Sequence, residues 1–377
     1  MDPFATPRSA YVHVPFCAHR CGYCNFAVVA GRDHLVGDYL RAIEAELALR
    51  PGPCEVDTLY FGGGTPTRLP LPDFVRLSEM LLAARPLAAG AEWTVEANPA
   101  DLGDAYVARM AELGVTRLSL GAQSLRDAKL RLLERDHAAG DIARTVASAK
   151  QHGIRVALDL IFAAPGETLD QWRADLDALA ALGPDHASTY GLTFERGTSF
   201  WSRRMHGGLE ELGDEPQRAM YELAIERLTA AGFEHYEVSN FALPGRRSRH
   251  NQVYWSGGAF DALGPGAARY TQGVRETNHR STTTYLKRVL GGRSPVAERE
   301  TLDAEARARE RLVFGLRRIE GVERAAFAAD TGFGLDGLAG AAIEKFVALG
   351  MLSDDGERVR LTRDGLLVSD AIWPELL

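Results

Sequence analysis

The sequence has 377 residues, of which 46% are hydrophobic, and its 51 acidic and 43 basic side chains give a net charge of −8. This length suits one large domain with one or two smaller modules, while the negative charge argues against a general binder of nucleic acid. With only four cysteines, we do not expect a disulfide framework. No basic leader precedes an apolar run and no apolar stretch approaches about eighteen residues, so we expect neither export nor a membrane span. We therefore predict a cytoplasmic location.

Three cysteines near the N-terminus form the most specific chemical motif. Cys17, Cys21 and Cys24 follow a strand-like run and are separated by three and then two residues. Thiolates on one short loop can hold three irons of a [4Fe-4S] cluster and leave the fourth iron open to a small-molecule ligand. The alternative is a structural zinc site with His13 or His19 as fourth ligand, although zinc ligands usually come as two separated pairs.

Apolar, β-rich runs then alternate with amphipathic helical segments, the first of them at 36–47. This repeated strand-then-helix order predicts a parallel sheet with crossover helices, either a full or partial barrel or an open doubly wound sheet. The strands are expected at 11–14, 56–61, 93–96, 117–120, 156–162, 186–191 and 235–239.

Glycine-rich and polar residues lie at the ends of several of these strands. The run 62–66 follows the second strand, Glu96 ends the third, Gln123 follows the fourth, and Asp159 lies in the fifth. Each alone is an ordinary tight turn, cap or strand-end acid. Because ligands of parallel α/β folds bind at the carboxyl ends of the strands, their shared position predicts a ligand site. The glycines would let backbone N–H and C=O groups approach the amino and carboxylate ends of that ligand.

The cysteine spacing and the 62–66 loop resemble the radical S-adenosylmethionine superfamily. Within it, the segments 11–17, 96–99, 118–124, 159–162 and 236–241 are similar to the oxygen-independent coproporphyrinogen oxidase group, over nearly the whole chain. The run His-Asn-Gln-Val-Tyr-Trp at 250–255 is similar to the HNxxYW signature of the HemW branch, whose members are regarded as heme chaperones. Phe26 stands where the oxidase branch usually has a further cysteine.

The resemblance implies a partial (β/α) TIM-like barrel of the radical S-adenosylmethionine type, and a [4Fe-4S] cluster whose open iron is chelated by S-adenosylmethionine. Cys17, Cys21 and Cys24 would bind the cluster. The family positions expected to contact cofactor are Tyr11, Tyr23, Gly63, Gly64, Thr65, Glu96, Gln123, Arg135, Asp159 and Thr193.

His250 is the candidate axial ligand of heme. Imidazole commonly binds heme iron, Tyr254 and Trp255 could stack on the flat macrocycle, and the arginines of the run 246–249 could pair with its propionates. The alternative is an ordinary hydrogen-bonded histidine beside a solvated basic stretch.

The C-terminal part predicts a separate module. Helices are expected at 307–316 and 338–349, then a hairpin turning at 355–356 and a final helix near 363. This order suggests a small winged-helix-like α+β domain, for which a lid or partner-docking role is favoured over DNA binding because no basic stripe is present. The expected division is 1–240 for the barrel, 241–300 for a connecting segment with the HNxxYW motif, and 301–377 for the C-terminal domain.

Three functions fit these motifs. The favoured one is a HemW-like heme chaperone that binds the cluster, S-adenosylmethionine and heme and delivers heme to acceptor proteins. The others are a radical enzyme acting on a porphyrin, such as coproporphyrinogen III, and a zinc-stabilised interaction protein. No catalytic residue is assigned. The expected partners are heme, heme-accepting proteins and an electron donor for the cluster, with no nucleic acid and no integral membrane segment; peripheral contact with a membrane-bound acceptor is left open.

Overall fold

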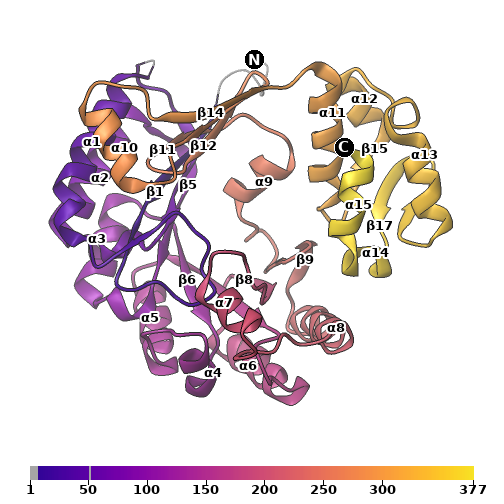
Figure 1. The fold of residues 1–377 in the computed structure, drawn as a ribbon, viewed down its shortest axis with the longest axis horizontal. Coiled ribbons are helices and arrows are strands. Elements are labelled where there is room, and N and C mark those ends of the chain that lie inside the picture. The colour runs from indigo at the N-terminus through magenta and orange to yellow at the C-terminus, as the bar shows by residue number, and fades with distance from the viewer. Residues whose placement is uncertain (1–6, 51) are drawn as a thin grey trace.

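The structure, a computed structural model, describes residues 7–50 and 52–377. A nine-stranded sheet forms its centre, and the strands from β11 to β8 in its order all run parallel, while β10 pairs antiparallel with both β8 and β9. The order begins at β11 and ends at β9, so the sheet is open and the predicted partial barrel is confirmed (Figure 1). In sheet order the strands are β11 (Asp261–Leu263), β1 (Ser9–Val14), β4 (Val56–Gly63), β5 (Leu87–Ala97), β6 (Arg117–Gln123), β7 (Arg155–Phe162), β8 (His186–Gly191), β10 (Asn240–Ala242) and β9 (Glu234–Glu237).

Helices follow the parallel strands and cover the outer face of the sheet (Figure 1). The sequence marks their ends: α6 begins after Thr168, whose hydroxyl and the Gln171 side chain form a capping box, and stops at Gly183 with φ 60°. These helices are α1 (Val36–Ala48), α2 (Leu71–Ala84), α3 (Asp104–Leu113), α4 (Asp127–Leu132), α5 (Ala139–Gln151), α6 (Leu169–Leu182) and α8 (Asp214–Ala230). The short helix α7 (Ser199–Met205), between β8 and α8, packs instead on the cysteine loop, where the Phe200 N–H donates to the Gly22 carbonyl at 2.8 Å.

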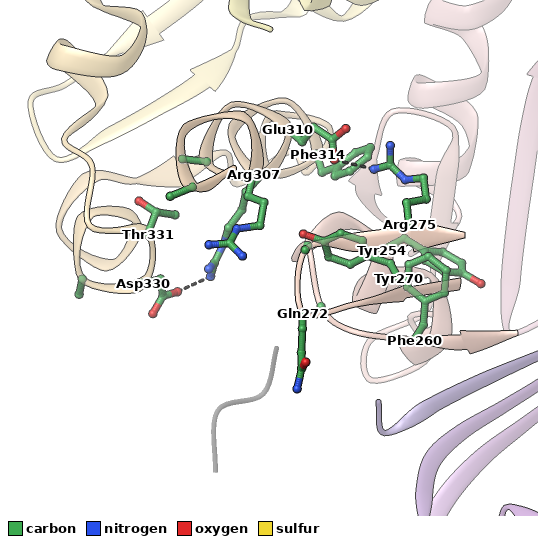
Figure 2. A pocket seen from close by; sticks show the side chains of 17 residues that line it. Tyr254, Phe260, Tyr270, Gln272, Arg275, Arg307, Glu310, Phe314, Asp330 and Thr331 are labelled. Atoms are coloured by element: carbon green, nitrogen blue, oxygen red, sulfur yellow. Dashed lines mark hydrogen bonds and ion pairs between the residues drawn. The ribbon is translucent and has the colours of Figure 1, made fainter. Parts of the chain in front are cut away.

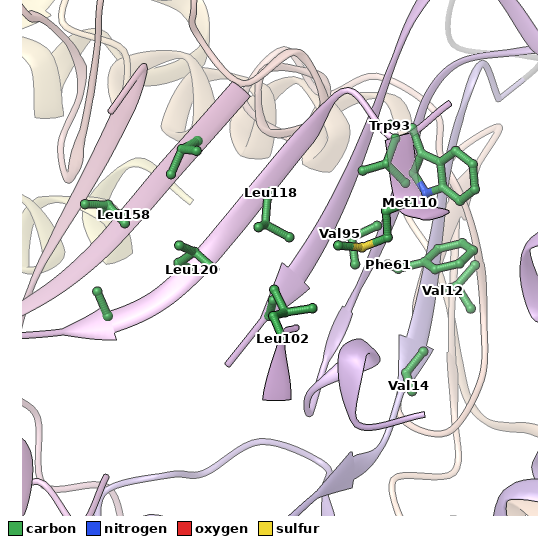
Figure 3. Packing of buried hydrophobic residues seen from close by; sticks show 14 of the residues in the cluster. Val12, Val14, Phe61, Trp93, Val95, Leu102, Met110, Leu118, Leu120 and Leu158 are labelled. Atoms are coloured by element: carbon green, nitrogen blue, oxygen red, sulfur yellow. The ribbon is translucent and has the colours of Figure 1, made fainter. Parts of the chain in front are cut away.

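The main hydrophobic core lies between the sheet and these helices. Phe61 of β4 and Trp93 of β5 pack edge to face with ring centres 5.3 Å apart, and Met110 of α3 packs beside them (Figure 3). Both rings are fully buried. This packing fixes the strands whose carboxyl ends carry the predicted site.

Two strand predictions are corrected. β5 begins at Leu87 rather than near 93, because its first half consists mainly of alanine and glycine and shows no strand pattern; it contains Gly90 at φ 71°, where the pairing with β4 also shifts register. The strand expected at 235–239 is β9, which ends at Glu237, and a turn at 238–239 leads into the antiparallel β10.

The chain between β10 and the C-terminal domain crosses back to the start of the barrel. It forms α9 (Arg249–Trp255), adds β11 beside β1, and places α10 (Thr282–Leu290) against α1. A three-stranded antiparallel sheet completes it, made of β12 (Ala268–Thr271), β13 (Val274–Asn278) and β14 (Val296–Thr301). The β12–β13 turn is the pair Gln272-Gly273 with φ values of 52° and 77°, the backbone that a tight two-residue hairpin needs.

The C-terminal domain has its own hydrophobic core and a three-stranded sheet in the order β15, β17, β16. The predicted winged-helix-like order is confirmed, and the hairpin turns at 355–356 as expected. No helix in the described parts of the chain is both long and apolar enough to cross a bilayer. The elements are α11 (Ala304–Leu316), β15 (Val322–Glu323), α12 (Arg324–Thr331), α13 (Leu335–Ala348), β16 (Leu352–Asp354), β17 (Arg358–Leu361), α14 (Arg363–Leu367) and α15 (Ser369–Leu376).

Candidate functional site

A cavity of about 520 Å³ lies between the cysteine loop and the carboxyl ends of the parallel strands. It collects predicted site residues from segments that lie up to about half the chain apart. Tyr11 and His250 are not part of its lining. The predicted residues that line it are Cys17, Cys21, Cys24, Tyr23, Gly63, Gly64, Thr65, Glu96, Gln123, Arg135, Asp159 and Thr193.

The cysteine loop is held at both ends by a short parallel pairing of β2 (Phe16–Cys17) with β3 (Val29–Ala30). All three thiols are free. The Sγ of Cys17 lies 3.6 Å from Thr65 Oγ1, and Arg135 Nη1 donates to the Sγ of Cys21 at 3.3 Å. Burial raises the pKa of the Cys17 thiol to about 11, so a soft metal must displace a firmly held proton when it binds there.

The donor set fits a cluster better than zinc. His13 is engaged elsewhere, with Nδ1 at 3.1 Å from the Tyr11 hydroxyl and Nε2 at 2.8 Å from the Ala27 carbonyl. His19 lies beside Cys21, but its Nε2 contacts the Glu134 carbonyl at 2.5 Å. Within residues 7–50 and 52–377, no three histidine, cysteine or acidic side chains converge as one metal ion would require. Three thiols spaced around one cavity suit a cube, where each thiolate binds a different iron.

The glycine-rich run packs against the cysteine loop. A Cβ on Gly64 would lie 2.8 Å from the Phe16 carbonyl oxygen, and Gly63 has φ 107°. The N–H groups of Gly64 and Thr65 donate to the Val14 and Phe16 carbonyls at 2.8 Å, and that of Gly63 donates to Glu96. These N–H groups therefore have partners within the protein and the glycines allow close packing, while contact of this run with a ligand, including through its C=O groups, stays a prediction.

Two partly buried carboxyl groups form an acidic floor of the cavity. Glu96 accepts hydrogen bonds from the Tyr60 hydroxyl at 2.7 Å and the Gly63 N–H at 2.9 Å, and burial raises the pKa of its carboxyl to about 7. Asp159 accepts from Ser119 Oγ at 3.4 Å, and burial raises its pKa to about 6. A cationic ligand would favour the ionised form of both groups, so this floor is suited to a sulfonium or ammonium group.

Arg135 supplies the opposite charge on the same cavity. Its Nη2 donates to Asn98 Oδ1 at 2.9 Å and to the Gly121 carbonyl at 3.1 Å, while its buried Nε has no hydrogen-bond partner in the described protein. Nearby, Gln123 has φ 63°, a strained backbone for a residue other than glycine. The cavity thus combines soft sulfur donors, carboxylates and a cation, as recognition of a zwitterionic sulfonium compound needs.

Tyr11 lines a neighbouring cavity of about 420 Å³. The two cavities share Gly63, Glu96 and Phe26 in their linings, and the Phe26 side chain is 67% exposed. Tyr254 belongs to this second lining as well.

His250 is buried on α9, with 1% of its surface exposed. Its Nδ1 lies 2.8 Å from Thr58 Oγ1 and its Nε2 lies 2.8 Å from the Tyr254 hydroxyl. Burial lowers the pKa of the imidazole to about 3, so it is neutral at physiological pH. Both ring nitrogens are engaged, so axial ligation, which stays a prediction, would require the bond to Tyr254 to break.

Two other kinds of predicted heme contact have partners within the protein, and their contact with heme stays a prediction. Trp255 is 9% exposed and packs edge to face on Tyr236. The arginines of the run 246–249 are also engaged: Arg247 with Glu234 and Glu320, and Arg249 with the Gly90 carbonyl.

Residues that the sequence did not single out complete the cluster cavity. Ser119 of β6 bonds Asp159, and Tyr190 and Leu192 line the wall at the end of β8. The residues at the end of β8 could have been predicted from the sequence, because the rule that ligands bind at the carboxyl ends of parallel strands applies to this strand as well.

Comparison with known proteins gives the family. The model of the radical SAM superfamily matches residues 11–179, and that of the HemN C-terminal domain matches residues 302–368. The chain is 32% identical to the heme chaperone HemW of Bacillus subtilis over 98% of this chain and 99% of the relative. It is 37% identical to the heme chaperone HemW of Mycobacterium tuberculosis over 98% of this chain and 95% of the relative.

The fold has a solved counterpart. The coproporphyrinogen III oxidase HemN of Escherichia coli superimposes with a TM-score of 0.87, at 21% identity, covering 99% of this chain and 90% of that one. The superfamily implies a [4Fe-4S] cluster and S-adenosylmethionine, and the thiols, acidic floor and Arg135 fit them. The chain belongs to the HemW family of the radical SAM superfamily.

Proposed function

We propose that this protein is a heme chaperone, which binds a [4Fe-4S] cluster, S-adenosylmethionine and heme and delivers heme to acceptor proteins. The observation that carries the proposal is the similarity to bacterial proteins named heme chaperone HemW over 98% of the chain. Phe26 supports it, because a thiol at that place would belong to the oxidase branch.

The residues of the cluster cavity have separate tasks in this proposal. Cys17, Cys21 and Cys24 hold the cluster, which when bound supplies one electron to the sulfonium of S-adenosylmethionine. Glu96 and Asp159 balance the positive charge of the ligand, and Arg135 its carboxylate. Expected partners are heme-accepting proteins and an electron donor for the cluster, in the cytoplasm, where the three thiols stay reduced.

A radical enzyme acting on a porphyrin is the second candidate. It is favoured by the 420 Å³ cavity, which adjoins the cofactor cavity through Gly63 and Glu96 and leaves room for a substrate there. Anaerobic reconstitution with S-adenosylmethionine and a reductant, followed by addition of heme or coproporphyrinogen III, separates the two. We expect stable stoichiometric heme binding and no fast oxidation of coproporphyrinogen III. Fast oxidation would contradict the chaperone function and support the radical enzyme.

The role of His250 can be resolved with a pair of variants. If His250 binds heme iron, His250→Ala lowers heme affinity at unchanged iron and sulfide content, whereas Tyr254→Phe preserves or raises it because Nε2 becomes free. A heme titration followed by absorbance measures both. Equal losses of heme affinity in the two variants would indicate that His250 has a structural role instead, bridging Thr58 and Tyr254.

A further inference from the structure

A second and larger cavity, of about 970 Å³, lies between the middle segment and the C-terminal domain (Figure 2). One side is formed by α9, the residues before β11 and the β12–β13 hairpin, and the other by α11 and α12. None of the residues predicted to bind the cluster or S-adenosylmethionine lines it, whereas Tyr254, a predicted heme contact, does. Its volume is at the upper end of the range of about 300–1,000 Å³ that small-molecule sites occupy.

One wall of this interdomain cavity is aromatic. Tyr254 and Phe260 meet edge to face with ring centres 4.7 Å apart, and Phe260 lies 6.3 Å from Tyr270. Phe314 and Ala308 of α11 contribute to the opposite side. Aromatic side chains in series favour a flat conjugated ligand, which can stack on them while it is removed from water.

Arg307 differs in its contacts from the other arginines of the cavity. Arg275 is paired with Glu310 at 2.6 Å and Glu300 at 3.0 Å, and Arg311 is paired with Asp330. The Arg307 guanidinium, by contrast, has no hydrogen bond or ion pair with any residue the structure describes. Figure 2 shows Arg307 reaching from α11 into the space in front of the hairpin.

The hairpin turn leaves room for this guanidinium. A Cβ on Gly273 would lie 2.7 Å from Arg307 Nη1, so the turn glycine lets the side chain pass along the hairpin. A cation beside an aromatic wall is a matched site for a carboxylate on a flat ring.

We infer that the interdomain cavity binds a planar conjugated macrocycle with carboxylate side chains, the porphyrin class to which heme belongs, with the ring on the wall of Tyr254, Phe260 and Tyr270 and a carboxylate on Arg307. The inference rests on the proposed heme-handling function and assigns the interdomain cavity as a binding site for heme. The described lining contains no histidine, cysteine or methionine, so recognition at this site depends on ring and carboxylate and is separate from the predicted iron ligation by His250; the iron-free ring is expected to bind here as well.

The test uses the full-length protein and three ligands: heme, iron-free protoporphyrin IX and the dimethyl ester of that porphyrin. Arg307→Glu should weaken binding of the first two about tenfold, because a charge-assisted contact becomes a repulsion, and should change binding of the ester little. The control is Arg293→Glu, the same charge change at an exposed arginine outside the cavity.

A second variant tests the aromatic wall, as Arg307→Glu tests the charge. Tyr270→Ala removes part of the aromatic wall and should weaken all three ligands, the ester included. If the unmodified protein binds heme and neither Arg307→Glu nor Tyr270→Ala alters any affinity, the interdomain site is refuted while the chaperone function stands. An unmodified protein that binds none of the three ligands refutes both.

Discussion

The fold changes the protonation behaviour of the Glu96 carboxyl group. Its pKa is raised from the ordinary value of 4.5 to about 7 because it is buried next to Asp159 and receives only two hydrogen bonds. It therefore changes charge within the physiological range, and S-adenosylmethionine, a cation, should bind more tightly above that pKa than below it.

Glu96→Gln tests this charge through stability. The folded protein keeps the Glu96 proton up to about pH 7 and the unfolded chain only to about 4.5, so the free energy of unfolding should fall between these pH values as pH rises, by up to about 3 kcal/mol. Urea unfolding at pH 5 and pH 8 should show a smaller drop in Glu96→Gln. Equal drops in variant and parent would mean that Glu96 is ionised throughout. Asp159 contributes to the drop in both proteins, so the difference between the two drops reports on Glu96.

At the scale of the elements, the end of β4 and the cysteine strand β2 depend on one another. They meet where Gly64 is surrounded by backbone, with the Pro15 carbonyl carbon at 2.8 Å and the Val14 oxygen at 2.9 Å from a Cβ placed there. No flexible side chain can move aside at this contact, so its geometry controls the position of the cluster loop.

Gly64→Ala should displace the cysteine loop, destabilise the protein by about 1–3 kcal/mol and lower the iron and sulfide content after reconstitution. Gly140→Ala is the matched control, since nothing lies within 4 Å of its Cβ and alanine suits α5, so its Tm should be unchanged or higher. Full iron content in Gly64→Ala would show that the loop does not need this contact.

The same scale explains what the sequence could predict. The parallel strands were found because each is a continuous apolar run, and their carboxyl ends brought twelve of the predicted residues to one cavity because parallel strands end at one edge. Short strands such as β10 and β12 have too few residues to show an apolar run or an alternation from which a strand could be predicted. The surroundings of His250 were also beyond reach, since its partner Thr58 lies 192 positions away and only the folded chain brings them together.

At the scale of the whole molecule, a buried carboxylate is one of the links between the barrel and the C-terminal domain. Glu237, fully buried at the end of β9, accepts from Arg317 Nε and Nη2 at 2.9 and 2.6 Å. Its other oxygen accepts from Ser239 N at 3.0 Å and Asn240 Nδ2 at 2.6 Å. The relative position of the two walls of the interdomain cavity therefore depends in part on this ion pair.

Arg317→Ala should destabilise the protein by about 3–5 kcal/mol, because it leaves the charge of Glu237 buried without its partner. Thermal unfolding and limited proteolysis between the domains measure the effect. The double variant Glu237→Gln with Arg317→Ala should recover part of the loss, since the unpaired charge is gone. A double variant no more stable than Arg317→Ala would assign the loss to packing of the arginine side chain.

The pairing of β11 with β1 also has a consequence for synthesis. Ala10 lies opposite Asp261, so this edge of β1 lacks its partner strand until about 250 further residues have been translated. During that interval the nascent barrel presents an unpaired strand edge, a template for association with other chains. The protein is thus expected to depend on folding assistance until its middle segment emerges, and truncation before residue 261 should yield aggregates rather than a smaller barrel.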